Sequence, residues 1–217
     1  MSRPAAFLFD LDGTLADTLP DLAASTNHVR GAHGLPPVAE DAVRRFVGDG
    51  ARTLLRRALA ELGDAVDDAL LDRAFAAYAA HHMEQCTTRT AAYPGVREHL
   101  DALRRRGHPL AVVTNKPERF AVPVVRHLGL ADLLPVVVGG DTLPVKKPDP
   151  APLRHALDRL GAAADGATMV GDGVQDLRAG KALGARTIGC LFGYGDPALL
   201  RAEGADRWWR AFGVLEG

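Results

Sequence analysis

The sequence predicts an α/β protein: a doubly wound parallel sheet with a helical domain inserted after its first strand. Three observations predict this class. Short continuous apolar runs recur along the chain, helical patterns precede the last four of these runs, and a long stretch without a strand pattern follows the first run. Short apolar runs bounded by turns are typical of buried parallel strands, and their alternation with helices is typical of a doubly wound sheet.

The expected strands begin with the apolar run AAFLF at residues 5–9, which stops at Asp10. The later runs lie at 109–114, 135–139, 167–171 and 186–191. Apolar residues recur at helical spacing in the segment before each later run, so we expect helices at 96–106, 118–128, 150–160 and 174–183.

The long stretch between the first two strands has helical patterns throughout, at 19–31, 40–47, 51–61 and 67–85. It is too long for a loop. We therefore predict that residues 1–16 and 93–217 form a Rossmann-like α/β core and that residues 17–92 form an α-helical cap. His81 and His82 fall on the last of these helices and have no metal-ligand spacing, so we expect them on its surface.

The C-terminal tail, DRWWRAF at residues 206–212, is aromatic and amphipathic. We expect a last helix that covers the sheet, because large aromatic side chains bury much surface. A dimer contact is the alternative.

Composition excludes several classes of protein. The chain has 217 residues, of which 47% are hydrophobic and 24% charged, which excludes a disordered chain. A net charge of −1 gives no support for a nucleic-acid partner. Cys86 and Cys190 are far apart, which excludes a disulfide scaffold and fits a reducing compartment. The N-terminal segment has no signal-peptide or membrane-span pattern, so we expect a cytoplasmic monomer or homodimer.

Polar residues follow each expected strand at its carboxyl end, which is where open α/β sheets bind ligands. They comprise Asp10, Asp12, Gly13 and Thr14 after the first strand, Thr114 and Asn115 after the second, Lys146 and Lys147 beyond the third, and Asp172 and Asp176 after the fourth. Lysine occurs only at positions 116, 146, 147 and 181, which makes the pair at 146 and 147 conspicuous.

Asp10 and Asp12 point to the same side of an extended chain, where two carboxylates repel unless a cation lies between them. Clustered carboxylates suit Mg²⁺, which also binds substrate phosphate. We expect Asp10 to attack phosphorus. We expect Asp12 to donate a proton to the leaving oxygen and then to take one from water. Thr114, Asn115 and one lysine would then hold the phosphoryl oxygens of a small phosphorylated metabolite.

Each of these residues also has an ordinary structural interpretation. A DxD sequence at a strand end often forms a turn or helix cap, and Thr114 is a possible N-cap. Lys147 suits a solvated loop, and Asp176 suits a capping position on the helix after Gly173. Their coincidence at four strand ends favours a functional site.

Four segments resemble the signatures of the haloacid dehalogenase superfamily, in its phosphatase branch and in the family's order. They are DLDGTLADT at 10–18, VTNK at 113–116, KPDP at 147–150 and VGDGVQD at 170–176. The third segment selects Lys147 over Lys146. Gly173 is a departure, because the family usually has Ser or Thr there. The resemblance implies a Mg²⁺ site made by the Asp10 side chain, the Asp12 backbone carbonyl and the Asp172 side chain, with Asp176 orienting these ligands or their waters. It also implies that the helical insertion is a cap of the family's first type.

Three weaker segments resemble bacterial phosphoglycolate phosphatases: FVGDGA at 46–51, GGDTLP at 139–144 and GYG at 193–195. The resemblance implies hydrolysis of 2-phosphoglycolate to glycolate and phosphate. Substrate contacts are then expected from the cap, through the backbone at Gly50 and the side chain of Arg52. The alternative for Arg52 is a solvated helix face.

Two groups of alternative functions follow. The first is another enzyme of the same architecture, such as a pyrophosphatase, a sugar phosphatase or a β-phosphoglucomutase-like isomerase. The second is a non-catalytic sensor of a phosphorylated ligand, whose expected mark is the loss of Asp10 or Asp12; both are present. A dehalogenase would not need the acid at Asp12, and a phosphonatase would need a lysine in residues 18–92, where there is none.

Overall fold

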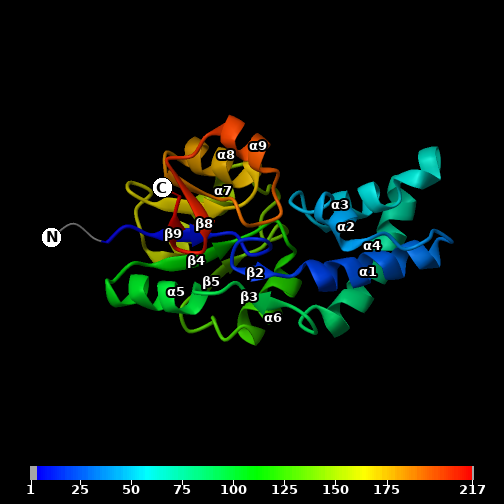
Figure 1. Cartoon of the computed structure of the whole chain (residues 1–217), viewed down its shortest axis with the longest axis horizontal. Coiled ribbons are helices and arrows are strands. Elements are labelled where there is room, and N and C mark those ends of the chain that lie inside the picture. The colour runs from blue at the N-terminus through cyan, green and yellow to red at the C-terminus, as the bar shows by residue number, and fades with distance from the viewer. Residues whose placement is uncertain (1–3, 217) are drawn as a thin grey trace.

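The structure is a computed structural model that describes residues 4–216. These residues form an α/β sandwich around a seven-stranded sheet, and a helical unit extends from one end of it (Figure 1). The strand order is β5-β4-β1-β6-β7-β8-β9. The strands are β1 (Phe7–Phe9), β4 (Leu110–Val113), β5 (Val136–Val138), β6 (Thr168–Gly171), β7 (Arg186–Cys190), β8 (Arg207–Ala211) and β9 (Val214–Leu215).

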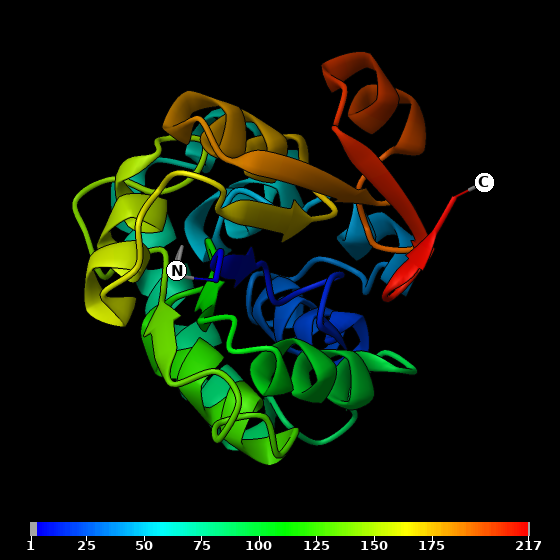
Figure 2. The same ribbon diagram turned by 90° about the vertical axis from the view of Figure 1, so that its left-hand side faces the viewer.

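The first strand lies in the middle of the sheet (Figure 2). It pairs in parallel with β4 on one side and β6 on the other, so that Phe9 lies between Val112 and Val170. Because β1 is buried on both faces, it is a continuous apolar run, as the sequence predicts. The order reverses at β1, which makes its carboxyl end the switch point where open α/β sheets bind ligands.

Helices cover both faces of the sheet, which confirms the doubly wound class (Figure 1). On one face α5 (Val96–Arg105) and α6 (Glu118–His127) pack against one set of strand side chains, including Phe9. On the other face α7 (Ala151–Leu160) and α8 (Val174–Leu183) pack against the alternate set, including Leu8. Successive strand residues therefore belong to different cores.

A two-stranded ribbon connects the sheet to the helical insertion (residues 18–90). Its strands are β2 (Ala16–Asp17) and β3 (Ala91–Ala92), which pair antiparallel. Between them lie α1 (Leu19–Ala32), α2 (Glu40–Arg44), α3 (Ala51–Ala58), the 3₁₀ helix η1 (Ala60–Ala65) and α4 (Asp68–Gln85). The sequence predicts these helices at nearly the same positions, but it does not reveal the ribbon, whose strands have two residues each.

The insertion has a hydrophobic core of its own, which includes Leu22, Leu55 and Tyr78 and extends to Phe120 of α6. Asp21, buried in α1, anchors the return of the chain to the sheet. Its carboxylate accepts hydrogen bonds from the backbone N–H of Arg89 and Thr90 and from the Thr90 hydroxyl. The entry and exit of the insertion are thus fixed to each other beside the ribbon.

The C-terminal tail corrects one expectation from the sequence. Residues 206–212 do not form a helix: β8 pairs in parallel with β7 and turns back at Gly213 into β9. A short helix, α9 (Pro197–Glu203), precedes β8. Trp209 and Phe212 are buried against the sheet, so the expected covering of the core is achieved by an added strand. Among the described residues, no helix is both long and apolar enough to cross a bilayer.

Candidate active site

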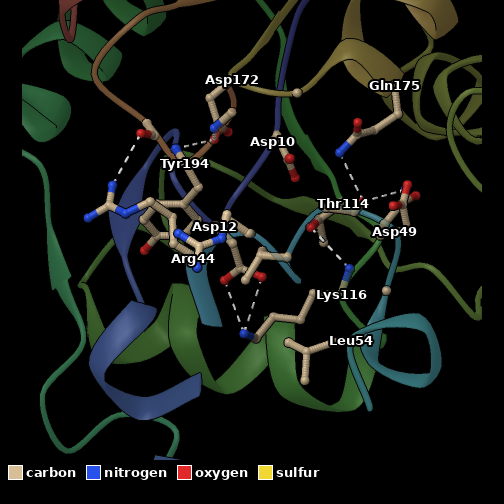
Figure 3. Close-up of a pocket in the computed structure, with 18 of the residues that line it drawn as sticks. Asp10, Asp12, Arg44, Asp49, Leu54, Thr114, Lys116, Asp172, Gln175 and Tyr194 are labelled. Carbon is tan, nitrogen blue, oxygen red and sulfur yellow. Dashed lines mark hydrogen bonds and ion pairs between the residues drawn. The ribbon is translucent and has the colours of Figure 1, made fainter. Parts of the chain in front are cut away.

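A cavity of about 750 Å³ lies between the carboxyl end of the sheet and the helical insertion. The core contributes Asp10, Asp12 and Asp172 from the loops after β1 and β6, and Thr114 and Lys116 from the loop after β4. The insertion contributes a wall that includes Arg44, Gly50, Leu54 and Tyr78. Figure 3 shows these two sets of side chains facing each other across the cavity.

Three buried carboxylates meet beside the cavity. One oxygen each of Asp10, Asp172 and Asp176 lies within 4.8 Å of the other two. Burial raises the pKa of the Asp172 and Asp176 carboxyls, and the charge of Asp10 raises both further. When ionised, the three carboxylates therefore repel one another unless cations compensate their negative charge.

Lys147 supplies part of that compensation. Its ammonium lies 3.2 Å from Asp10 Oδ1 and 2.6 Å from Asp176 Oδ1, and it donates to the Val113 carbonyl oxygen at 2.6 Å. Burial alone would lower the pKa of Lys147, but the two carboxylates outweigh burial and raise it. The side chain is therefore a fixed buried cation beside the proposed nucleophile, where the sequence predicts a phosphate-binding lysine.

The acid cluster fits a divalent metal ion. Its donors are hard carboxylate oxygens, and one lysine cannot neutralise three buried acids. Asp172 is held in place by three donors: the Thr14 hydroxyl at 2.7 Å and the backbone N–H groups of Tyr194 and Gly195 at 2.7 and 3.3 Å. A side chain at Gly13 would lie 2.4 Å from Asp172 Oδ2, so only glycine allows this close approach.

Asp12 stands apart from the three-acid cluster, and its carboxylate points along the cavity (Figure 3). Its Oδ1 accepts from the Thr18 hydroxyl at 2.6 Å and from Lys116 Nζ at 3.0 Å. Lys116 Nζ also lies 3.3 Å from Oδ2. The structure thus separates the two acids of the first signature, one toward the cluster and one toward a lysine. This arrangement suits the different roles that the sequence predicts for them.

No role for Lys116 was predicted, because nothing in one sequence shows which way its side chain turns. The structure places it in the cavity with a side chain that is 3% exposed. A usable signal was the rarity of lysine in this chain and its position directly after two expected phosphate ligands.

Thr114 and Asn115 lie in the cavity at the end of β4, as expected from their sequence position. Thr114 is buried, and its hydroxyl accepts a hydrogen bond from the Lys116 backbone N–H. The Asn115 amide donates to the carbonyl oxygens of Gly48 and Lys147, at 2.9 and 3.0 Å. In this arrangement Asn115 links the core to the insertion, and its contact with phosphate stays a prediction.

The two residues predicted to contact substrate from the insertion have different positions. Gly50 lines the cavity, next to the backbone carbonyl of Asn115. Arg52 does not: it pairs with Asp72 of α4 on an exposed face. The expected contact of Arg52 with substrate is therefore corrected: Arg52 lies on a solvated helix face, which was the alternative, because its side chain pairs with Asp72 of α4.

The expectation of surface histidines is also wrong for His82, which is fully buried in the insertion. Its ring stacks on Tyr78 with centroids 4.9 Å apart, and its Nδ1 lies 2.9 Å from the Ser25 hydroxyl. Burial, together with the nearby Lys116 charge, lowers the pKa of His82 to about 2, so the imidazole is neutral. The helical pattern of α4 did not show which of two adjacent histidines faces inward.

Comparisons with known proteins agree with this geometry. Residues 7–190 match the family model of the haloacid dehalogenase-like hydrolases. The phosphoglycolate phosphatase of Chromobacterium violaceum is 42% identical over 199 residues, which cover 91% of this chain and 90% of that protein. The phosphoglycolate phosphatase of Rhodospirillum rubrum is 45% identical over 195 residues, which cover 88% and 81%. A crystal structure of a "predicted phosphoglycolate phosphatase" from Haemophilus somnus 129PT superposes with a TM-score of 0.89 at 30% identity, covering 98% of this chain and 96% of that chain.

Proposed function

The chain belongs to the haloacid dehalogenase-like hydrolase family and is a phosphatase, and we propose that it hydrolyses 2-phosphoglycolate to glycolate and phosphate with Mg²⁺ as cofactor. We also propose that residues 17–92 act as a cap that encloses this small substrate. The observation that carries the proposal is the placement of Asp10. It lies between a buried lysine at 3.2 Å and two further acids, at the wall of a cavity closed by the helical insertion.

In the proposed first step, a carboxylate oxygen of Asp10 attacks phosphorus. The bond from phosphorus to the ester oxygen breaks, and Asp12 gives its proton to the departing glycolate oxygen. Lys147 holds a phosphoryl oxygen, which supports the negative charge that gathers there in the transition state. Bound Mg²⁺ would lower the repulsion between the Asp10 carboxylate and the phosphate dianion.

In the proposed second step, a water molecule attacks the phosphorus of the aspartyl phosphate. Asp12 takes a proton from this water, the bond between phosphorus and the Asp10 oxygen breaks, and inorganic phosphate is released. The Asp12 carboxylate lies outside the metal cluster, where Thr18 and Lys116 hold it in place. The side chains of Asp10 and Asp172 and the backbone carbonyl of Asp12 would hold the metal, and Asp176, which also pairs with Lys147, would orient these ligands or their waters.

Two observations support a small acidic substrate. The cavity lies between the core and the insertion, which Asn115 and Gln175 join through the Gly48 carbonyl, and its volume of about 750 Å³ suits a metabolite rather than a macromolecule. The phosphoglycolate phosphatases of Chromobacterium violaceum and Neisseria gonorrhoeae match 91% and 97% of this chain over 90% and 89% of their own length.

The test is phosphate release from a panel of esters with added Mg²⁺, including 2-phosphoglycolate, hexose phosphates and pyrophosphate. We expect the highest kcat/KM on 2-phosphoglycolate, loss of activity in a chelator, and recovery when Mg²⁺ is restored. Asp10→Asn is expected to lower kcat on the order of 10⁴-fold or more, because it removes the nucleophile.

Three outcomes would contradict parts of this proposal. A higher kcat/KM on a hexose phosphate or pyrophosphate would overturn the substrate. Full activity in the chelator would exclude the metal role. An Asp10→Asn variant with the kcat of the wild type would exclude the covalent route, whereas an inactive wild type over the whole panel would favour a sensor of phosphorylated ligands.

A further inference from the structure

Lys116 is a buried cation whose charge the phosphoryl chemistry does not require. Its side chain is 3% exposed and lines the cavity, and its carboxylate partner is Asp12. The other buried lysine, Lys147, already lies between Asp10 and Asp176. Two lysines thus stand at opposite sides of the reacting centre, one toward the metal cluster and one away from it.

Among the residues that the structure describes, Asp12 is the carboxylate that pairs with Lys116. The neutral His82 lies near enough for the charge of Lys116 to help lower its pKa, and the cavity wall around Lys116 includes the apolar Leu54 and Phe120. Burying an ammonium in such a place costs free energy unless acceptors compensate it. Both oxygens of Asp12 accept from this ammonium, as Figure 3 shows, and an ammonium has three protons, so it can bind a further acceptor from the cavity that Lys116 lines.

The position of Lys116 relative to Asp12 fixes what it can reach. To transfer its proton, Asp12 must lie within hydrogen-bond distance of the ester oxygen. Lys116 Nζ is 3.0 Å from Asp12 Oδ1, so it lies within roughly 6 Å of that ester oxygen. In 2-phosphoglycolate the carboxylate carbon is two bonds beyond the ester oxygen, which brings its oxygens into the range of this ammonium.

We propose that Lys116 binds the carboxylate of the leaving group and so selects phosphate esters that carry an anionic group one carbon from the ester oxygen. This inference rests on the proposed function and adds a specificity residue to it. The selecting charge then comes from the core, at the end of β4, and not from the predicted Arg52 of the insertion.

The arginines of the cavity wall are less suited to this role, because they pair with other groups or are exposed to solvent. Arg57 pairs with Asp49, and its guanidinium also donates to the Phe46 carbonyl oxygen. Arg44 lies over the Tyr194 ring, 5.5 Å from its centroid, and 3.6 Å from Asp41. Arg45 lines the cavity but is exposed to solvent, where a charge pair is screened.

The test compares 2-phosphoglycolate with 2-phosphoglycolamide, in which a neutral amide replaces the carboxylate at nearly the same size. We expect the wild type to favour the carboxylate ester at least roughly tenfold in kcat/KM. Lys116→Met and Lys116→Gln both lose a contact to Asp12 that serves either substrate. The informative quantity is therefore the ratio of the two kcat/KM values, which we expect to fall by roughly 10- to 100-fold in both variants.

Two further variants complete the experiment. Lys116→Arg keeps the charge and is expected to retain a preference for the carboxylate ester. Lys181→Met removes an exposed lysine that pairs with Glu203 on α9 and does not line the cavity, and it is expected to keep the ratio of the wild type.

The outcomes separate the inference from the proposed function. If the wild type favours 2-phosphoglycolate and the Lys116→Met and Lys116→Gln variants keep the same ratio, the inference is overturned and the function stands. If the wild type favours 2-phosphoglycolate over the other esters but not over its amide, the inference is likewise overturned and the function stands. If it does not favour 2-phosphoglycolate over the other esters, the proposed function is overturned together with the inference that rests on it. A ratio that collapses in the Lys116 variants but not in Lys181→Met supports the inference.

Discussion

Gly173 has a structural explanation that the sequence alone does not provide. The Gln175 side chain folds back over it and donates to the Gly48 carbonyl oxygen at 2.9 Å, which joins the core to the helical insertion (Figure 3). A Cβ at Gly173 would lie 2.4 Å from Gln175 Nε2, and one at Gly48 would lie 2.6 Å from the same atom. Two glycines thus make room for one amide. Gly173, where the family usually has Ser or Thr, therefore makes room for the contact between the Gln175 amide and the Gly48 carbonyl.

We predict that Gly173→Ser displaces the Gln175 amide and breaks its bond to Gly48. Because a neutral hydrogen bond contributes about 1 kcal/mol, KM for 2-phosphoglycolate should rise about fivefold while kcat changes less. Steady-state kinetics of the single variant measures this directly.

The matched control is Gln175→Ala, which removes the same hydrogen bond without adding a side chain at 173. The double variant should be no worse than either single one, because both changes remove one interaction. If the increases in KM of the two single variants add up in the double variant, the effect of Gly173→Ser does not arise from loss of the Gln175 hydrogen bond.

Several site residues could be located from the sequence because they follow directly on strand ends. Asp10, Thr114 and Asp172 lie where the parallel strands bring them together. Lys147 lies beyond a strand end, and the resemblance of its KPDP segment, not its position, distinguished it from Lys146. Lys116 and Arg52 could not be placed in this way. Each has a long side chain whose direction is decided by a partner distant in sequence, Asp12 for one and Asp72 for the other.

At the scale of elements, the C-terminal tail shows why local pattern fails at a sheet edge. The aromatic residues of 206–212 suit a helix face and a strand almost equally, and the partner strand decides between them. β7 offers an unpaired edge, and β8 fills it, with Cys190 opposite Trp209. The ribbon of β2 and β3 was not predicted, because strands of two residues are too short to show an alternating pattern of apolar and polar residues.

We predict that Trp209→Ala lowers the free energy of unfolding by roughly 3–5 kcal/mol, because the side chain is buried against His99 and Phe212. Urea unfolding followed by circular dichroism measures this loss. The neighbouring Arg210 is exposed on the same strand, so Arg210→Ala should change stability by no more than about 0.5 kcal/mol. Equal effects of the two substitutions would contradict the strand assignment.

At the scale of the whole molecule, one buried imidazole makes stability depend on pH. The His82 ring packs edge-on against Phe120 of α6, with centroids 4.9 Å apart, and thus lies where the insertion meets the core. Burial first, and then the Lys116 charge, lowers its pKa to about 2 from an ordinary value of 6.5. The unfolded chain therefore binds a proton below pH 6.5 that the folded chain does not, and stability is lost as pH falls through this range.

We predict that this histidine alone lowers the free energy of unfolding by about 1.4 kcal/mol between pH 7.5 and pH 5.5. Urea unfolding of the wild type and of His82→Gln at both pH values measures the contribution. The difference between the two pH values should be smaller in the variant by this amount. A difference that is unchanged by the substitution would show that His82 is protonated in the folded protein.

The central place of β1 also bears on the order in which the fold can form. This strand precedes its partners β4 and β6, which begin only at Leu110 and Thr168. The helical insertion is synthesised between β1 and β4 and has its own apolar core, so it can condense before the sheet does. During synthesis the apolar β1 segment therefore stays without its sheet partners until Thr168 and the residues after it have been made.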